Sequence, residues 1–288
     1  MNQMQRILSA RRLSHSIIPQ SCFLHRRWFA TSETDASSPP LSSAHQKIQT
    51  LEDKASNKSR STASTTSSLN EQELAKFSAI ADTWWHSEGP FKPLHLMNPT
   101  RLAFIRSTLC RHFSKDPSSA RPFEGLRLID VGCGGGLLSE PLARMGATVT
   151  GIDAVDKNVK IARLHADMDP MTSKIEYQCT TAVFSCAEKL VDEGRTFDAV
   201  LALEVIEHVA NPAEFCNSLS ALTIPNGATI LSTINRSMRA YASAIVAAEY
   251  ILQWVKEMAG FVYNPITGRW LLSDDISVNF IAYGTKKE

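Results

Sequence analysis

The chain has 288 residues, of which 43% are hydrophobic, and its 30 basic and 29 acidic residues leave a formal charge of +1. This length suits one sizeable α/β domain with extensions, and the balanced charge excludes the global positive field that would draw a protein onto nucleic acid, so no nucleic-acid partner is expected. The six cysteines lack C-x-x-C spacing, which argues against a zinc ribbon or a disulfide framework. No apolar run reaches the length of about 20 residues that a helix needs to cross a bilayer.

The N-terminal region is typical of an imported mitochondrial protein. Residues 1–31 carry five arginines and several serines, and no acidic residue precedes Glu33. This composition predicts a mitochondrial transit peptide over 1–31, with a disordered basic arm as the alternative. Residues 32–69 are dense in Ser, Thr, Ala and Pro, which predicts a disordered linker, so that the folded domain occupies 70–288.

The folded domain begins with a helical pattern and continues with alternating strands and helices. Asn70-x-x-Glu73 offers a capping box to a helix over Ala75–Trp85, which ends before Gly89-Pro90. Beyond it the pattern predicts a Rossmann-like α/β fold with a doubly wound, mostly parallel sheet and a C-terminal antiparallel hairpin. The predicted strands are Leu126–Val131, Ala147–Asp153, Ile175–Cys179, Phe197–Leu203 and Ala228–Thr233, the predicted helices are Leu137–Met145, Lys157–Met168 and Ala213–Leu222, and the hairpin pairs Met258–Tyr263 with Ser277–Gly284.

A glycine-rich loop lies between the first strand and the helix after it. Asp130 is followed by Val131 and then by Gly132-Cys133-Gly134-Gly135-Gly136. Glycines at this turn let a cofactor contact the main chain, although nicotinamide- and flavin-binding folds share such loops. Asp153 ends the next strand about 20 residues later, where a carboxylate accepts both ribose hydroxyls. Asp130 suits the ammonium and sulfonium of S-adenosylmethionine better than a pyrophosphate, so the loop predicts S-adenosylmethionine, with a purely structural turn as the alternative.

Five segments together resemble one family. The glycine loop is joined by Gly146–Asp153, by Glu204-Val205-Ile206-Glu207-His208-Val209, by Tyr263-Asn264-Pro265-Ile266-Thr267, and by an upstream segment from Trp84-Trp85 to Leu102. These segments resemble the ubiquinone biosynthesis O-methyltransferases, which are class I S-adenosylmethionine-dependent methyltransferases. The resemblance runs from about Glu71 to the C-terminus.

The resemblance implies a substrate, a location and cofactor contacts. It implies O-methylation of polyprenylated catechol intermediates at two steps of ubiquinone biosynthesis, by a peripheral protein on the matrix side of the mitochondrial inner membrane, within a multi-subunit biosynthetic complex. Arg101, Gly132, Asp153 and Leu203 match cofactor contacts of the family. Asp130 and Gly134 are added from the loop itself.

A polar cluster follows the strand Phe197–Leu203 and is the candidate catalytic centre. A catechol hydroxyl has a pKa near 10, so a base or a metal must assist its deprotonation. Glu204, Glu207 and His208 suit a divalent cation, with Mg²⁺ favoured by the carboxylates and Zn²⁺ possible with the imidazole. The resemblance also implies metal dependence at Glu-x-x-Glu-His. His208 is alternatively the general base, and a solvated Glu pair beside a packed His is the structural alternative.

An apolar stripe offers a route to a lipid substrate. Its residues recur at helical spacing from Tyr241 to Val255, after Arg236 and Arg239. This pattern fits a helix lying in a bilayer interface, and equally a core helix packed on the sheet. The Trp84 helix is either a lid over the site or ordinary core.

The chain departs from the family at two places. The sequence passes from Val255 directly to Lys256, whereas relatives have a further loop and helix there, and a few residues are added near Thr181–Ala187. The departures raise a second hypothesis, a noncatalytic scaffold member of a ubiquinone biosynthetic complex. A third hypothesis, a nicotinamide oxidoreductase, fits the glycine loop but leaves the tryptophan segment and Glu-x-x-Glu-His unexplained.

Overall fold

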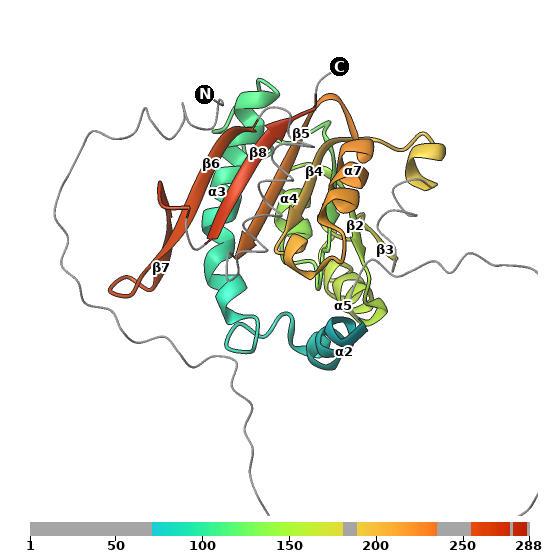
Figure 1. The fold of residues 1–288 in the computed structure, drawn as a ribbon, viewed down its shortest axis with the longest axis vertical. Helices are drawn as coiled ribbons and strands as arrows, with labels where there is room; N and C mark the ends of the chain where they lie inside the picture. The colour runs from blue at the N-terminus through green and yellow to red at the C-terminus, as the bar shows by residue number, and fades with distance from the viewer. Residues whose placement is uncertain (1–70, 181–188, 235–254, 277–278, 287–288) are drawn as a thin grey trace, which may run out of the picture. The chain divides into compact units, whose positions relative to one another are not determined.

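The computed structural model describes residues 71–180, 189–234, 255–276 and 279–286, all within one compact unit, Ser61–Glu288 (Figure 1). Several predictions fall outside these residues: the transit peptide, the linker, the cap at Asn70, the extra residues at 181–187, and the stripe from Tyr241 to Leu252. The helix predicted from Tyr241 to Val255 was wrong at its last residue, because Val255 is the first residue of a strand.

The described strands form one sheet in the order β3-β2-β1-β4-β5-β8-β6-β7. The first five strands are parallel, and β8 runs antiparallel to both of its neighbours, β5 and β6, so β6 points in the same direction as β5. The predicted doubly wound, mostly parallel sheet is therefore confirmed. The strands are β1 (Arg127–Val131), β2 (Thr148–Asp153), β3 (Glu176–Cys179), β4 (Phe197–Leu203), β5 (Thr223–Ile234), β6 (Val255–Asn264), β7 (Arg269–Ser273) and β8 (Asn279–Thr285).

Helices pack on both faces of this sheet, because neighbouring strand residues point to opposite sides. On β1, Leu128 joins the core cluster that includes residues of α3 (Lys92–His112), α4 (Ser139–Arg144) and α5 (Asp156–Ala166). Its neighbour Ile129 joins the cluster beneath α7 (Pro212–Leu222). The three helices predicted after the glycine loop are thus present, with ends that differ by a few residues.

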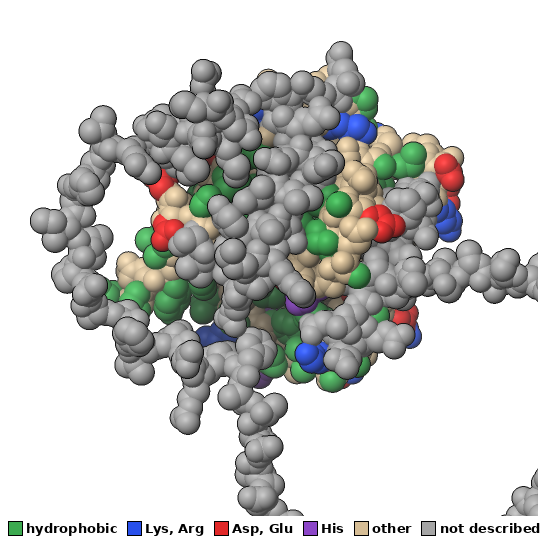
Figure 2. Space-filling model, in the orientation of Figure 1, with side chains coloured by type: hydrophobic (Ala, Val, Ile, Leu, Met, Phe, Trp, Pro, Cys, Tyr) green, Lys and Arg blue, Asp and Glu red, His purple; other side chains and the backbone are tan. Residues whose placement is uncertain are grey.

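The C-terminal strands correct one prediction. The predicted segments pair antiparallel, as β6 with β8, but they do not form a hairpin. The chain first turns at 265–268 into β7, which pairs with the other edge of β6, and Gly268 supplies the positive φ of +66° at this turn. The hairpin is therefore β6–β7. In Figure 2, green hydrophobic side chains lie over this hairpin, at the lower left of the view.

The helices before the sheet also differ from the prediction. The tryptophan helix is divided into α2 (Glu71–Ile80) and a 3-10 turn, η1 (Ala81–Thr83), so Trp84 follows the helix instead of ending it. The long helix α3 was not predicted. Pro93 suits its first turn, where a missing N–H costs nothing, whereas Pro99 lies inside it.

Candidate functional site

The glycine loop leaves the carboxyl end of β1 and is packed tightly on both sides. Gly132, Gly134 and Gly136 have φ of +77°, +54° and +88°, a region that favours glycine. A Cβ at Gly132 would lie 2.3 Å from Val205 Cγ2, and one at Gly134 would lie 2.5 Å from Trp84 Cη2. The first and third loop residues therefore have to be glycine for steric as well as conformational reasons.

Asp153 lies at the end of β2 beside this loop, as predicted. Its carboxylate accepts hydrogen bonds from the Gly134 N–H at 2.9 Å, the Val155 N–H at 2.8 Å and the Asn158 side-chain amide at 3.0 Å. Burial raises the pKa of Asp153, and these three donors act in the opposite direction. The structure thus brings together the glycine loop and Asp153, the two features that the sequence predicts to bind the cofactor.

The tryptophan segment is tied to the same carboxylate through Asn158. The buried Trp84 indole donates from Nε1 to Asn158 Oδ1 at 2.8 Å and stacks on Phe91 with ring centroids 3.6 Å apart. Trp85 donates to the carbonyl of Gly135 at 2.9 Å. Sequence reasoning missed Asn158, whose only signal is its place in the first turn of the helix after Asp153.

Asp130 lies in β1 directly beneath the loop and is almost fully buried. Ser139 Oγ, from the first turn of α4, donates to its carboxylate at 2.6 Å. Desolvation raises the pKa of Asp130 to about 7, opposed by the Ser139 hydrogen bond and reinforced by the negative charge of Asp153. This carboxyl therefore changes its charge near neutral pH. Ser139 was not predicted.

Arg101 and Glu204 form a buried ion pair across the site. Arg101 projects from α3 and donates to Glu204 Oε1 at 2.6 Å, and Ser232 Oγ donates to the same oxygen at 2.7 Å. Glu204 follows the end of β4 at Leu203, with a left-handed φ of +58°. Among the described residues, the buried atoms Arg101 Nε and Glu204 Oε2 have no hydrogen-bond partner. Unpaired buried atoms of this kind are costly, and a bound group that pairs with them would remove the cost.

The predicted metal cluster is not assembled in this structure. Glu204 turns toward Arg101 and Ser232, Glu207 accepts from Thr233 Oγ1 at 3.0 Å, and the His208 ring lies edge-on to Phe77 with centroids 5.3 Å apart. Within the described ranges, no three His, Cys, Asp or Glu side chains are grouped to hold a metal ion. Since a buried arginine already neutralises the Glu204 charge, these residues as arranged do not fit a resident cation.

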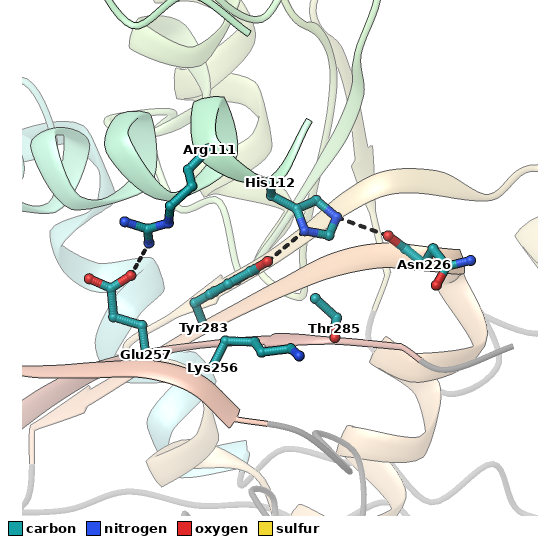
Figure 3. Close-up of a pocket in the computed structure, with 7 residues that line it drawn as sticks. All are labelled: Arg111, His112, Asn226, Lys256, Glu257, Tyr283 and Thr285. Carbon is teal, nitrogen blue, oxygen red and sulfur yellow. Dashed lines mark hydrogen bonds and ion pairs between the residues drawn. The ribbon is translucent and has the colours of Figure 1, made fainter. Parts of the chain in front are cut away.

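A cavity of about 500 Å³ lies away from this edge of the sheet (Figure 3). It is lined by residues from the end of α3, from β5 at Asn226, from the start of β6 and from the end of β8. His112 lies between Tyr283 Oη, at 2.6 Å from Nδ1, and the Asn226 carbonyl, at 2.9 Å from Nε2, while Arg111 pairs with Glu257. None of the predicted site residues lines this cavity, and its contacts join α3 to the C-terminal strands.

The chain is similar to known methyltransferases in sequence and in fold. A family model described as a methyltransferase domain matches residues 101–272. The chain is 76% identical, over 100% of its length and 96% of the relative, to a protein of Arabidopsis thaliana named mitochondrial ubiquinone biosynthesis O-methyltransferase. It is 43% identical, over 75% of its length and 93% of the relative, to the ubiquinone biosynthesis O-methyltransferase of Parvibaculum lavamentivorans.

Solved structures agree on the fold. A Thermotoga maritima protein described as an S-adenosylmethionine-dependent methyltransferase matches with a TM-score of 0.50 and 14% identity, over 74% of this chain and 100% of that one. The alignment with the Arabidopsis protein runs over 316 positions, whereas this chain has 288 residues. That relative therefore contains at least 28 positions that this chain lacks.

Proposed function

Since the chain belongs to the ubiquinone biosynthesis O-methyltransferase family, we propose that it transfers a methyl group from S-adenosylmethionine to a catechol hydroxyl of polyprenylated dihydroxybenzoate and demethylubiquinol intermediates. It is an S-adenosylmethionine-dependent O-methyltransferase by family and by fold. The observation that carries the proposal is the convergence of the glycine loop, Asp153 and the Arg101–Glu204 pair around one edge of the sheet.

The site residues fit this cofactor. Asp153 is placed for the ribose hydroxyls, and the loop from Gly132 to Gly134 provides the close backbone approach. Two buried atoms without partners in the described structure, Arg101 Nε and Glu204 Oε2, match the carboxylate and the ammonium at the methionine end of the cofactor. When ionised, Asp130 adds a negative charge to this site, and we assign to Leu203, at the end of β4, a further contact with the cofactor.

The protein mainly aligns the reactants and removes one proton. When bound, S-adenosylmethionine supplies an electrophilic methyl group, so the phenol oxygen has to lie in line with the sulfur–methyl bond in a site that excludes water. His208 lies on the 3-10 turn η2 (Ile206–His208) after β4, close to Phe77 of α2. We assign to His208 the acceptance of the phenolic proton, because an imidazole positioned beside the hydroxyl is a common general base.

Metal dependence is kept apart from this mechanism. The donor chemistry of Glu204, Glu207 and His208 suits Mg²⁺ or Zn²⁺, but their arrangement does not, so no step is derived through a metal. Activity measured after chelation, and again after Mg²⁺ or Zn²⁺ is added back, tests the dependence directly. A Glu207→Ala variant with unchanged activity and no response to Mg²⁺ would remove the metal prediction.

The location and partners follow from the substrate. The Arabidopsis relative is named mitochondrial, and no helix in the described ranges has both the length and the apolar character to cross a membrane. We propose peripheral attachment to the matrix side of the inner membrane, where a polyprenyl substrate resides, within a multi-subunit ubiquinone biosynthetic complex.

The test uses the purified chain and a short-chain prenyl catechol. Methyl transfer from labelled S-adenosylmethionine is expected, and Asp153→Asn is expected to raise the cofactor KM. His208→Gln is expected to lower kcat mainly, because the variant lacks the proton acceptor. A folded chain that binds the cofactor but methylates neither a prenylated dihydroxybenzoate nor a demethylubiquinol would instead favour the noncatalytic scaffold.

A further inference from the structure

Five large apolar side chains are exposed on the β6–β7 hairpin, among them Tyr263 and Leu272 on the α3 side and three others. Ile266, in the turn, is 94% exposed, and Leu271 and Val262 are 50% and 45% exposed. Val262 and Leu271 are directly paired across the two strands, so their side chains share one face. Phe261, next to Val262, points the other way and is buried in the core cluster beneath α3. The exposed pair therefore lies on the face opposite α3.

The turn of this hairpin points toward the cofactor edge of the sheet. Because β6 runs in the same direction as β5, its last residue, Asn264, lies at the edge where β1, β2 and β4 deliver the glycine loop, Asp153 and Glu204. Figure 1 shows the turn end of the β6–β7 hairpin extending beyond the neighbouring strands of the sheet. A surface that the turn contacts is therefore brought near the opening of the site.

Charge divides the hairpin along its length. Arg269 is exposed near the turn, on the same face as Leu271, and forms no ion pair with the described residues. Asp274 and Asp275 follow β7 at the opposite end. Tyr263, 43% exposed, and Trp270 lie with ring centroids 5.4 Å apart on the α3 side of the hairpin. An apolar tip with aromatic rings and a cation suits an anionic bilayer interface, which the acidic end would avoid.

We propose that the tip of the β6–β7 hairpin, formed by Val262, Ile266, Arg269 and Leu271, docks on the anionic surface of a lipid bilayer. The docking brings the site to the membrane that holds the polyprenyl tail, so this inference rests on the proposed function. A second copy of the chain fits the surface less well. Stable interfaces bury about 800 Å² per partner from roughly 20 or more residues, whereas the whole segment from Val262 to Leu271 has ten residues.

The experiment measures vesicle binding by flotation. The wild-type chain is compared with an Ile266→Ser/Leu271→Thr double variant and with Arg269→Gln, on vesicles of phosphatidylcholine alone and with cardiolipin added. Leu164→Gln is the matched control, because Leu164 is 66% exposed on α5, which packs near the opposite end of the sheet. The double variant should bind about tenfold more weakly to both vesicles. Arg269→Gln should lose only the gain from cardiolipin, and the control should match wild type.

Activity separates this proposal from the proposed function. With a water-soluble short-chain catechol, all variants should keep wild-type kcat and KM, whereas with a long-chain catechol in cardiolipin vesicles the double variant should lose about tenfold in kcat/KM. If wild type fails on the short-chain substrate, the proposed function fails. The docking proposal is overturned if wild type does not float with cardiolipin vesicles or if the double variant floats as well as wild type. It is likewise overturned if the double variant changes only the oligomeric state.

Discussion

Cofactor affinity should depend on the ionisation of Asp130. Burial raises the pKa of this carboxyl to about 7 from an ordinary value of 3.8. The cofactor brings two positive charges, so binding favours the ionised form and should release a proton below neutral pH. If only the ionised form binds well, Kd should rise about 15-fold between pH 7 and pH 5.5 and approach tenfold per pH unit below that. In this window the cofactor ammonium, with a pKa near 7.8, stays charged.

The assay is isothermal titration calorimetry with S-adenosylmethionine, in buffers of different ionisation enthalpy so that proton release is counted. Asp130→Asn keeps an acceptor for Ser139 and removes the charge, so its Kd should be weaker at pH 7 and nearly constant across the window. Asp153, whose pKa burial also raises, is unchanged in that variant. A wild-type Kd that is flat between pH 5.5 and 7, or an Asn variant that keeps the wild-type slope, would refute the reasoning.

Three further predictions concern the same loop. A carboxyl group whose pKa is raised in the folded state lowers the free energy of unfolding as the pH rises from its unfolded pKa to its folded pKa. Asp130→Asn should therefore stabilise the ligand-free chain by up to about 4 kcal/mol at pH 8 and by nothing near pH 3. Denaturant unfolding at the two pH values measures this difference. Gly132→Ala should weaken cofactor binding at least about tenfold, because its φ of +77° and the contact with Val205 both oppose a Cβ; Gly194→Ala, with φ of +71° and open space, should cost only the backbone strain of roughly 1–2 kcal/mol in stability. Trp84→Phe removes the indole donor and should raise the cofactor KM about fivefold, the equivalent of about 1 kcal/mol, with kcat unchanged in steady-state assays.

The sheet was predictable because buried parallel strands appear in a sequence as nearly continuous apolar runs. Leu126–Val131 and Phe197–Leu203 match β1 and β4 to within a residue. The long helix α3 was missed because Pro99 interrupts the pattern, and only the pairing of α3 with the sheet makes that proline tolerable. The β6–β7 turn was missed because β7 (Arg269–Ser273) is mostly exposed and lacks the continuous apolar run of a buried strand.

The site divides in the same way between local and distant signals. The glycine loop and Asp153 were predicted because adjacent strand ends place them together. Arg101 was assigned only through the family resemblance, since no sequence rule brings α3 to Glu204 across the fold. The metal prediction treated Glu204, Glu207 and His208 as one group because of their spacing after the strand Phe197–Leu203 and because of the family resemblance. In the structure the left-handed Glu204 backbone and the donors Arg101 and Ser232 direct its carboxylate elsewhere.

The positions missing from this chain should affect substrate handling more than cofactor binding. Every predicted cofactor residue lies between Arg101 and Glu204, before the departure near Val255. The link between β5 and β6, residues 235–254, has 20 residues. A crossover between parallel strands needs about a dozen residues, so a link of this length is sufficient for the observed sheet order. If the additional positions of the Arabidopsis relative fall in this link, they lie beyond every predicted cofactor residue and next to the final strands.

We therefore expect the chain to bind S-adenosylmethionine whether or not it methylates a long-chain catechol. Calorimetry on a chain shown to be folded by circular dichroism measures the first property, and single-turnover methyl transfer measures the second. Cofactor binding with weak methyl transfer would locate the effect of the missing positions on the substrate side. A folded chain that does not bind the cofactor would contradict the argument, because it would show that the departure near Val255 reaches the glycine loop through the sheet.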